Sequence, residues 1–591
     1  MKQLWLLLFS IASLLSLPGR ADAAPVKPEK ARQVALGVLV SPVGTRSGQP
    51  ALELVWDGES AATRSNADPA FYVFNRTDAS GFVIVAGDDA AVPLLGYSSE
   101  GKFRREGMPA NVQAWFRAVR ETILTARERG LPPLPAWRNA ASSRTGNVVR
   151  LLSTALWNQT PPFNDDCPLY QGQRTLTGCV ATAAAIVMHY NRWPDHGIGV
   201  VPAYTTRTYS IHVPERVLKP YDYDLMLERY DNGYTPAQAA ETARLIADAG
   251  SICSIDYGLE ATGAYTSDLL TGLITYMRYS KAASLAYKES YSDREWIALM
   301  KREVEANRPV LYAGDNGEAG HQFVLDGYDD QDYFHFNWGW GGYDNGWFYI
   351  GGAGFEFVFN QCAIVDLEKD PDGTTTRLSD LKFYPYTNEK GVEYRGLTTD
   401  AQTIRQNVPF EVLAGAYGNF GPDVFTGTVK LTVCDAAGEL KEDVSEVFPI
   451  VGLPSMMMTA PDGTLTCRIT GRIAAGDRIR AFYKADDESQ WRILRRYTEG
   501  MQDEIVLTPQ IDKDYIAARS TFAYDRTARR IVLSTCENAD VTLTGPNGAT
   551  LFDEHTVTGK VDIAVSTFGK GICTLSIGVA DAEPFALQVV L

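Results

Sequence analysis

Residues 177–185 read TGCVATAAA, a glycine turn followed by an alanine-rich run. Alanine has the highest helix propensity, so this run predicts a helix that begins close to Cys179. The first turn of a helix presents unpaired backbone N–H groups and the positive end of the helix dipole. Both stabilise a thiolate relative to a thiol. We therefore expect the pKa of Cys179 to be lowered and this cysteine to act as a nucleophile.

A histidine suited to serve as the base lies far downstream. His321 stands in AGHQFVLDG at residues 319–327, after a glycine and before an apolar run typical of a strand. Its ring can therefore face a cleft at the start of that strand. A long separation between cysteine and histidine is typical of papain-like cysteine peptidases, in which the two residues come from different halves of one domain.

The next predicted strand offers residues that can orient the imidazole of His321. Residues 335–342 read HFNWGWGG. The side-chain carbonyl of Asn337 can accept a hydrogen bond from imidazole Nδ1–H, and the indole of Trp338 can keep water from that contact. By strand alternation His335 falls on the same face as Asn337, so His335 is the main rival of His321 for the role of base.

Gln159, in LWNQT at residues 156–160, completes the predicted site. Acyl transfer requires N–H donors for the oxyanion that forms on the attacked carbonyl. The side-chain amide of Gln159 and the backbone N–H of Cys179 are the expected donors. Each of these residues is weak evidence alone, but their order along the chain is that of one catalytic site.

Composition excludes several other classes of function. The 591 residues carry a formal net charge of −17, which argues against a nucleic-acid partner. The eight cysteines are thinly spread, with no CxxC pair and no Cys/His cluster at zinc spacing, so we expect no metal and no organic cofactor. A single cysteine is usually inert packing, and this is our expectation for Cys253, Cys362 and the four cysteines that follow them.

The N-terminus has the form of a secretory signal peptide over residues 1–23. Lys2 supplies the positive charge, residues 4–17 are an apolar run too short to span a membrane, and residues 21–23 read ADA, a small-x-small cleavage site. No later segment has 18 consecutive apolar residues, so we expect an exported chain with no membrane span.

The remaining sequence divides into four parts. Residues 24–147 combine a hairpin signal at 71–89 with helical spacing at 111–129. Residues 148–369 hold helical patterns first and strands second, an α+β arrangement. Residues 370–512 and 513–591 are successions of short alternating runs separated by turn residues, which predicts a β-sandwich domain and a further C-terminal β-domain. The overall fold class is therefore α+β, with a papain-like catalytic domain at its centre.

A polar linker is expected between the first two parts. A proline-rich stretch at 131–135 is followed by the polar segment 138–146, the kind of exposed chain at which proteases cut. Arg144 and Arg150 are the predicted cut sites.

The segment 148–369 resembles the streptopain family of secreted papain-like cysteine peptidases. The resemblance rests on WNQ at 157–159, TGCVATA at 177–183, GHQFVLDG at 320–327 and FNWGWGG at 336–342. It implies that Cys179 and His321 form the catalytic dyad, that Gln159 is the oxyanion donor, and that Asn337 and Trp338 support His321. Protein or peptide substrates are implied as well.

The first part resembles the propeptide of the same family, through YVFN at 72–75, GFVIVAGDD at 81–89 and LGYS at 95–98. The resemblance implies that residues 24–147 are an inhibitory prodomain that covers the cleft and is removed by proteolysis, so that the enzyme is made as a zymogen. The C-terminal segment 563–575 is similar to sorting tails of type IX secretion, which implies retention at the bacterial cell surface.

Two other functions stay open from the residues alone. An adhesion or binding protein with an inactive protease-like domain would use the C-terminal β-domains. A transglutaminase-like acyltransferase would use the same Cys179 and His321, but such enzymes usually orient the histidine with an aspartate. The presence of Asn337 and of the propeptide-like part favours hydrolysis.

Overall fold

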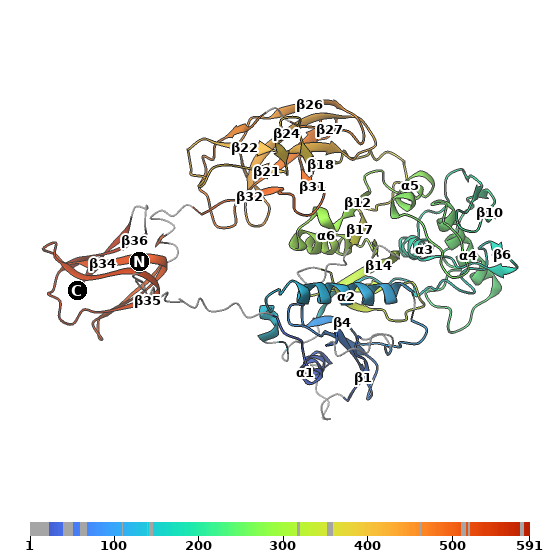
Figure 1. Ribbon diagram of the computed structural model, residues 1–591, viewed down its shortest axis with the longest axis horizontal. Helices are drawn as coiled ribbons and strands as arrows, with labels where there is room; N and C mark the ends of the chain where they lie inside the picture. The colour runs from blue at the N-terminus through green and yellow to red at the C-terminus, as the bar shows by residue number, and fades with distance from the viewer. Residues whose placement is uncertain are drawn as a thin grey trace, which may run out of the picture. The chain divides into compact units, whose positions relative to one another are not determined.

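The computed structural model describes residues 23–39, 51–58, 68–108, 110–138, 140, 146–315, 320–350, 359–460, 463–509, 516–517, 520–579 and 584–591. The signal-peptide prediction falls almost wholly outside these residues. The chain forms two compact units, Met1–Leu378 and Ser379–Leu591. The first unit mixes strands with helices, and the second is built of strands (Figure 1). Within the described residues, no helix is long and apolar enough to cross a membrane.

The N-terminal part of the first unit is a four-stranded antiparallel sheet with two helices. The predicted hairpin is confirmed, because β2 and β3 pair along their length. Its elements are α1 (Pro28–Leu39), β1 (Leu52–Trp56), β2 (Phe71–Arg76), β3 (Phe82–Ala86), β4 (Leu94–Ser98), α2 (Ala110–Glu128) and the 3-10 helix η1 (Pro135–Arg138).

The rest of the first unit places helices before strands, as predicted. Its helices are α3 (Cys179–Asn191), α4 (Pro236–Ser251), α5 (Thr266–Tyr276), the 3-10 helix η3 (Lys288–Ser290) and α6 (Asp293–Glu305). Its longer strands are β5 (Val148–Leu151), β12 (Ser284–Tyr287), β13 (Val310–Asp315), β14 (Gly320–Asp329), β15 (Tyr333–Asn337), β16 (Gly346–Tyr349) and β17 (Phe359–Val365). Three two-residue pairs complete it, formed by β6 (Leu169–Tyr170) with β7 (Gln173–Arg174), β8 (Val200–Val201) with β11 (Arg216–Val217), and β9 (Tyr204–Thr205) with β10 (His212–Val213).

One continuous sheet joins the two parts of this unit. Its strand order is β1-β2-β3-β4-β16-β15-β14-β13-β17-β12, with β5 beside β14. The junction is the antiparallel pair of β4 with β16, in which Gly96 lies opposite Phe348. A Cβ at position 96 would lie 2.8 Å from Cδ1 of Phe348, so only glycine allows this close approach. The sequence did not predict that the propeptide-like part extends the sheet that carries His321.

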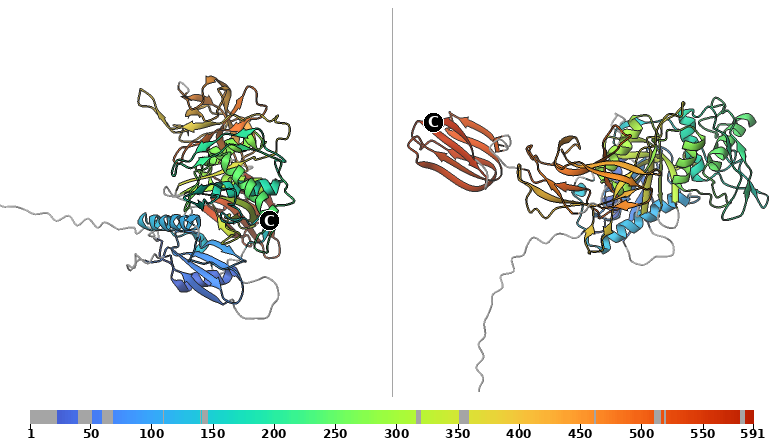
Figure 2. Two further views of the ribbon diagram at one scale, coloured as in Figure 1. Left: turned by 90° about the vertical axis from the view of Figure 1, so that its right-hand side faces the viewer. Right: turned by 90° about the horizontal axis from the view of Figure 1, so that it is seen from above.

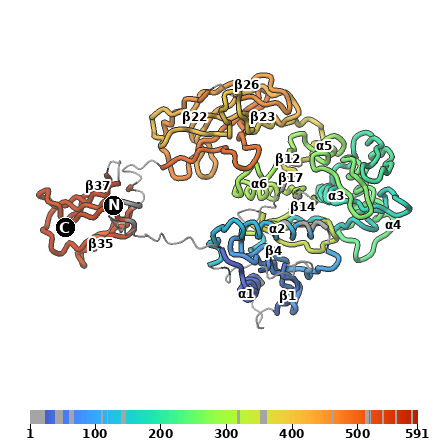
Figure 3. The backbone as a smooth tube through the Cα atoms, in the orientation of Figure 1, coloured from blue at the N-terminus to red at the C-terminus, as the bar shows by residue number. Residues whose placement is uncertain are grey.

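Helix α2 packs over this junction (Figure 1), and the tube in Figure 3 follows the chain from β4 into it. The ring of Trp115 on α2 meets that of Phe348 on β16 edge to face, with centroids 5.2 Å apart. Side chains of the N-terminal part and of strands β13 to β17 belong to one hydrophobic core. A second core lies among α3, α4 and α5. We call them the sheet core and the helical core.

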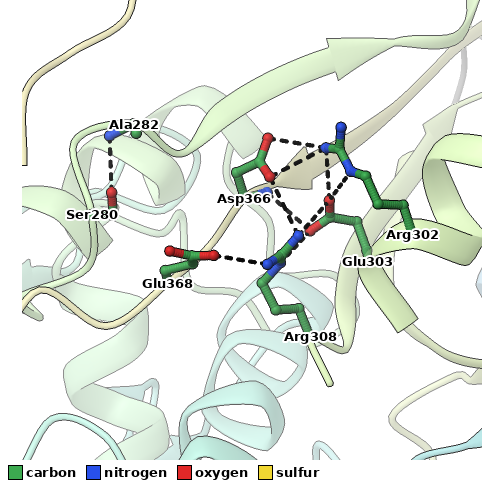
Figure 4. A network of polar contacts seen from close by, with 7 residues as sticks. All are labelled: Ser280, Ala282, Arg302, Glu303, Arg308, Asp366 and Glu368. Atoms are coloured by element: carbon green, nitrogen blue, oxygen red, sulfur yellow. Dashed lines mark hydrogen bonds and ion pairs between the residues drawn. The ribbon is translucent and has the colours of Figure 1, made fainter. Parts of the chain in front are cut away.

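Ion pairs fasten α6 to the end of β17 (Figure 4). Glu303 is buried and accepts from Arg308 at 2.7 Å and from Arg302 at 2.9 Å. Both arginines also contact Asp366, Arg302 at 3.1 Å and Arg308 at 3.3 Å. A buried carboxylate is tolerated only where cations and hydrogen bonds replace water, and the two guanidinium groups do so here.

Most of the predicted linker, residues 138–146, lies outside the described residues. Residues 141–145, which include Arg144, lie outside the described residues, but Arg150 lies within β5 and pairs with Tyr328 of β14. Just before β5, the backbone and side chain of Asn147 both donate to Asp330 at 2.8 Å. Arg150, the other predicted cut site, is exposed but paired within the sheet, because residues 148–151 add a strand to β14.

The second unit is built of strands, with one core for residues 381–507 and another for 516–589. The first region contains β18 (Leu381–Tyr384), β19 (Tyr386–Thr387), β20 (Glu393–Tyr394), β21 (Leu397–Thr398), β22 (Phe410–Ala414), β23 (Ala416–Asn419), β24 (Phe425–Cys434), β25 (Leu440–Asp443), β26 (Phe448–Leu453), β27 (Met458–Thr459), β28 (Leu465–Cys467), β29 (Arg478–Ala485), β30 (Arg492–Ile493), β31 (Arg495–Arg496) and β32 (Glu504–Val506). The second contains β33 (Thr521–Asp525), β34 (Arg530–Thr544), β35 (Thr550–Ala564), β36 (Ile572–Gly578) and β37 (Phe585–Val590). Figure 2 shows this second group as a single twisted sheet.

Candidate active site

Cys179 is the first residue of α3, as its sequence predicts. Gly178 caps the helix with φ +81°, and a Cβ there would lie 2.6 Å from Cγ2 of Thr262, so glycine is required for two reasons. Cys179 is half-buried and packs against the helical core. Its sulfur accepts a hydrogen bond from the backbone N–H of Gln322, the residue that follows His321. Helix α3 thereby meets the start of β14.

The expected direction of the Cys179 pKa is wrong for the chain with its N-terminal part in place. Burial raises the pKa of the thiol, and this effect exceeds the opposing hydrogen bonds from the backbone N–H groups of Gln322, Val180 and Cys179 itself. Desolvation penalises a thiolate more than the helix start stabilises it. The cysteine is therefore held as a neutral thiol.

His321 lies buried near the start of β14. Its Nε2 lies 3.2 Å from the backbone carbonyl oxygen of Trp338. A carbonyl can only accept, so Nε2 carries the proton and Nδ1 carries the free lone pair. Burial lowers the pKa of His321 to about 3, although the Trp338 carbonyl opposes this shift. The imidazole is neutral in this state.

The two members of the predicted dyad pack against different cores. The ring of His321 lies 5.9 Å from that of Phe323 and 6.0 Å from that of Trp338, both members of the sheet core. Cys179 belongs with the helical core. Among the described residues, no hydrogen bond joins Cys179 to His321. The structure therefore brings the two residues to neighbouring chain segments without assembling a thiolate–imidazolium pair.

Gln159 is buried, and its Nε2 has no hydrogen-bond partner among the described residues. Its backbone oxygen accepts from the N–H of Thr177 at 3.3 Å, so the chain at Gln159 runs beside the loop that precedes Cys179. A buried donor without an acceptor is destabilising, by about 1–3 kcal/mol. Such a donor is expected where a site awaits an oxygen that is not yet present.

Asn337 and Trp338 lie at the end of β15 in a densely bonded turn. Asn337 is fully buried, but its side chain bonds to Thr154, Ala155 and Gly339 and not to His321. The observed acceptor for His321 is instead the backbone carbonyl of Trp338. Sequence reasoning missed this acceptor, because a backbone carbonyl carries no residue signature.

The indole of Trp338 is fixed in place. Its Nε1 donates to the carbonyl of Asp344 at 3.0 Å, and its ring packs on Phe323 with centroids 4.7 Å apart. It therefore forms a wall beside His321, with which it is also in ring contact.

The rival base, His335, is engaged elsewhere. Its Nδ1 lies 2.6 Å from Oδ1 of buried Asp326, and its ring meets Trp347 edge to face. Asp326 also accepts from the hydroxyl of Thr154. Neither Asp326 nor Thr154 was singled out from the sequence, although a carboxylate directly after the strand-like run of residues 322–325 was a visible signal.

No residue set in the described part of the chain suits a metal ion: it contains no group of three or more His, Cys, Asp or Glu side chains placed to hold one. Cys167, Cys253, Cys434, Cys467 and Cys573 are buried free thiols. Burial raises the pKa of Cys167 and of Cys253 to about 12, so both are inert packing residues.

Comparison with known proteins defines the class of this site. Residues 157–348 match the model of the peptidase C10 family, and residues 23–123 match that of the Spi protease inhibitor. The first match spans Gln159, Cys179, His321, Asn337 and Trp338. An inhibitor-like part thus precedes a peptidase-like part in one chain.

Individual relatives agree. The chain is 27% identical over 523 residues to the thiol protease/hemagglutinin PrtT of Porphyromonas gingivalis, covering 85% of this chain and 58% of PrtT. It is 29% identical over 296 residues to streptopain of Streptococcus pyogenes, covering 47% of this chain and 73% of streptopain.

Among solved structures, a prointerpain A fragment of Prevotella intermedia is 29% identical, with 96% of it covered and a TM-score of 0.44. Active interpain A cysteine protease from the same organism is 30% identical, with 95% of it covered and a TM-score of 0.34. The chain belongs to the streptopain family of cysteine peptidases, the peptidase C10 family, as its sequence motifs predict.

Proposed function

We propose that this protein is a cysteine endopeptidase made as a zymogen, with proteins or peptides as substrates. The Cys179 thiolate attacks the peptide carbonyl, and the carbonyl π electrons move to the oxygen. Gln159 Nε2 and the Cys179 backbone N–H bind that oxyanion. His321, which has taken the thiol proton, gives it to the leaving amine as the C–N bond breaks. Water then attacks the thioester, passes a proton to His321, and releases the acid and the thiol.

The unpaired Nε2 of Gln159 is the observation that carries this proposal. The amide nitrogen of Gln159 is buried beside the Cys179 loop and makes no hydrogen bond to the described residues, so it is available to an oxyanion on the attacked carbonyl. In a catalytic site the donor is paired when the oxyanion forms, so that its interaction stabilises the transition state alone.

Residues 24–147 are proposed to act as the inhibitor. They share a sheet and a core with the strands that carry His321, and His321 packs on Phe323 and Trp338 of that core. Their removal would strip α2 and β4 from β16. Water could then reach the site, and His321 could turn from the Trp338 carbonyl to Cys179.

We further propose the boundaries 1–23 for a signal peptide, 148–369 for the papain-like domain, 370–512 for a β-sandwich and 513–591 for a last β-domain. The three sheets that share one core in residues 381–507 support the sandwich. Export fits the apolar run at residues 4–17, and retention at the cell surface through the last domain is proposed from the similarity of residues 563–575 to sorting tails.

An adhesive role beside the peptidase activity is favoured by one observation. The match with PrtT, whose name includes hemagglutinin, covers 85% of this chain and so extends beyond the peptidase domain. Binding of the full chain with Cys179→Ala to cells would test this role without proteolysis of the cell surface.

The N-terminus of the protein after incubation tests the proposed function. Chain 24–591 is incubated under reducing conditions beside its Cys179→Ala variant, and the N-termini of the products are sequenced. Wild type should trim itself before Asn147, where hydrogen bonds to Asp330 begin, and the variant should stay whole. If neither is trimmed, and wild type freed of residues 24–146 by an added protease hydrolyses no peptide, the proposal is wrong.

A further inference from the structure

The hydrogen bonds of Asn337 fix which way its amide faces. Its Nδ2 donates to Oγ1 of Thr154 at 2.9 Å and to the carbonyl of Ala155 at 3.0 Å. Its Oδ1 accepts from the backbone N–H of Gly339 at 3.2 Å. The Ala155 carbonyl can only accept and the Gly339 N–H can only donate. Exchanging the amide oxygen and nitrogen of Asn337 would therefore break the bonds to these two groups. Because Asn337 is fully buried, no water is at hand to replace them.

Asp326 determines the role of the Thr154 hydroxyl in this arrangement. The hydroxyl bonds to Oδ2 of Asp326, which is 2% exposed, while Oδ1 bonds to His335. The Thr154 hydroxyl is the donor in its bond to Asp326, so its hydrogen is committed there. The lone pairs of the hydroxyl then face Asn337, and Thr154 can act toward Asn337 only as an acceptor.

The fixed amide presents its oxygen at the turn where His321 is held. Gly339, which donates to that oxygen, follows Trp338, whose carbonyl accepts from Nε2 of His321. An oxygen at this place can accept an imidazole N–H, whereas an amide nitrogen would oppose it donor to donor. In this structure Asn337 makes no hydrogen bond to His321, so its oxygen would accept from the imidazolium only after His321 has turned from the Trp338 carbonyl.

We propose that Thr154 and Asp326 are positioning residues of the catalytic site. Asp326 orients the Thr154 hydroxyl, Thr154 holds the amide of Asn337, and the oxygen of Asn337 then stabilises the protonated imidazole of His321 during the reaction. This proposal rests on the proposed peptidase function. It gives a role to the Asp326–His335 pair, which the reaction itself does not use.

The same residues link processing to the site. Thr154 follows β5, and the backbone N–H of Leu152 donates to the carbonyl of Asp326 at 2.8 Å. A cut before Asn147 leaves β5 and Leu152 bonded to β14. A cut after Arg150 would remove most of β5 and leave Thr154 near a free end.

The test compares Thr154→Val with Thr154→Ser. Each variant is made as chain 24–591 and measured after its N-terminal part has been removed. Valine keeps the shape of threonine without the hydroxyl, and serine keeps the hydroxyl. For Thr154→Val we expect kcat to fall roughly 10- to 100-fold while KM stays within about twofold, because the transition state and not the ground state loses an interaction. Serine should restore most of kcat.

The pH profile separates positioning from general damage. A hydrogen bond from imidazolium N–H to Asn337 favours the charged form of His321. Its loss lowers the pKa of His321 in the processed enzyme, so the alkaline limb of kcat/KM moves to lower pH in Thr154→Val. Asp326→Asn should also move the alkaline limb to lower pH. A carboxamide can donate to the Thr154 hydroxyl, which would then donate its own hydrogen toward Asn337 instead of accepting from it.

Thr242→Val is the matched control. Thr242 is a buried threonine on α4 whose hydroxyl bonds to Tyr230. Loss of the Thr242 hydroxyl should lower the melting temperature without moving the alkaline limb of kcat/KM. The proposal is overturned if Thr154→Val keeps the wild-type kcat and limb, if serine is as impaired as valine, or if Thr242→Val moves the limb equally. Wild type that is trimmed yet neither hydrolyses peptide nor reacts with an irreversible thiol-protease inhibitor would instead refute the peptidase function.

Discussion

The hydroxyl of Tyr97 on β4 donates a hydrogen bond of 2.8 Å to Oδ2 of Asp329 on β14, and both residues are buried. The bond joins the proposed inhibitor to the strand that carries His321. Burial raises the pKa of Asp329, and the backbone N–H of Tyr333, the Tyr97 hydroxyl and the N–H of Gln331 oppose that shift. The inhibitory part is therefore held by a polar contact as well as by an apolar core.

Tyr97→Phe should loosen the inhibitor. It leaves one oxygen of buried Asp329 without its side-chain donor, and we expect the unfolding free energy of the zymogen to fall by about 1–3 kcal/mol. Trimming before Asn147 should then be faster. Tyr72→Phe is the control, because Tyr72 bonds to Val26 within the inhibitor itself. Equal trimming rates for wild type and Tyr97→Phe, measured by gel over time, would show that this bond does not restrain activation.

Gly96→Ala tests the β4–β16 junction directly. The added methyl meets the ring of Phe348, so β4 has to move from β16, at a cost of about 1–3 kcal/mol. We expect a lower melting temperature of the zymogen and peptide hydrolysis before complete trimming. Gly263→Ala, where an added Cβ meets nothing within 4 Å, should change neither measurement. An unaltered melting temperature for Gly96→Ala would contradict the junction.

Gln159→Leu should separate catalysis from stability. Leucine is close to glutamine in volume and removes the unpaired Nε2 donor. The expected loss in kcat of processed enzyme is about 10²–10³-fold, as for removal of an oxyanion donor elsewhere. The melting temperature should stay equal or rise, because no existing bond of Nε2 is broken. A large fall in melting temperature with kcat unchanged would assign Gln159 a structural role instead.

Asp344→Asn should change the pH dependence of zymogen stability. Burial raises the pKa of Asp344 to about 6, with the charge of Arg104 opposing. A folded pKa above the unfolded one means that the folded state binds more protons, so stability falls as pH rises from about 4 through about 6. Asparagine removes this penalty and tolerates the left-handed φ of +58° at this position.

The variant should therefore melt at a higher temperature than wild type at neutral pH and at the same temperature below about pH 4, where Asp344 is protonated in both the folded and unfolded states. Thermal unfolding across this range measures the difference. Exposed Asp372→Asn is the control and should leave the curve unchanged. A constant difference at every pH would refute the assignment to Asp344.

Local sequence predicted the elements of the site and part of the fold. The glycine turn and alanine run predicted α3, and the apolar run after His321 predicted β14. The aromatic and β-branched runs predicted the hairpin of β2 and β3. These features depend on propensity and alternation within short windows. The continuous sheet through β4 and β16 could not be predicted in this way, because it depends on a pairing between segments distant in sequence. Gly96 permits that pairing, but a glycine at this position does not by itself indicate it.

The chemistry of the site was harder to predict than its residues. The pKa of Cys179 is raised because burial by distant segments exceeds the effect of its own helix. Asn337 contacts Thr154 from a segment remote in sequence, and His321 contacts a backbone carbonyl. Each of these facts depends on what covers or approaches the residue, which residue type and spacing do not record.

The stoichiometry of labelling at Cys179 tests the central claim most directly. Chain 24–591 would be treated with an irreversible thiol-protease inhibitor before and after trimming, with the mass of each species and hydrolysis of a protein substrate measured together. We predict little labelling of the zymogen, one label per trimmed chain at Cys179, and loss of hydrolysis in proportion to the label. Hydrolysis that survives complete labelling, or that persists in Cys179→Ala, would contradict the assignment of Cys179 as the nucleophile.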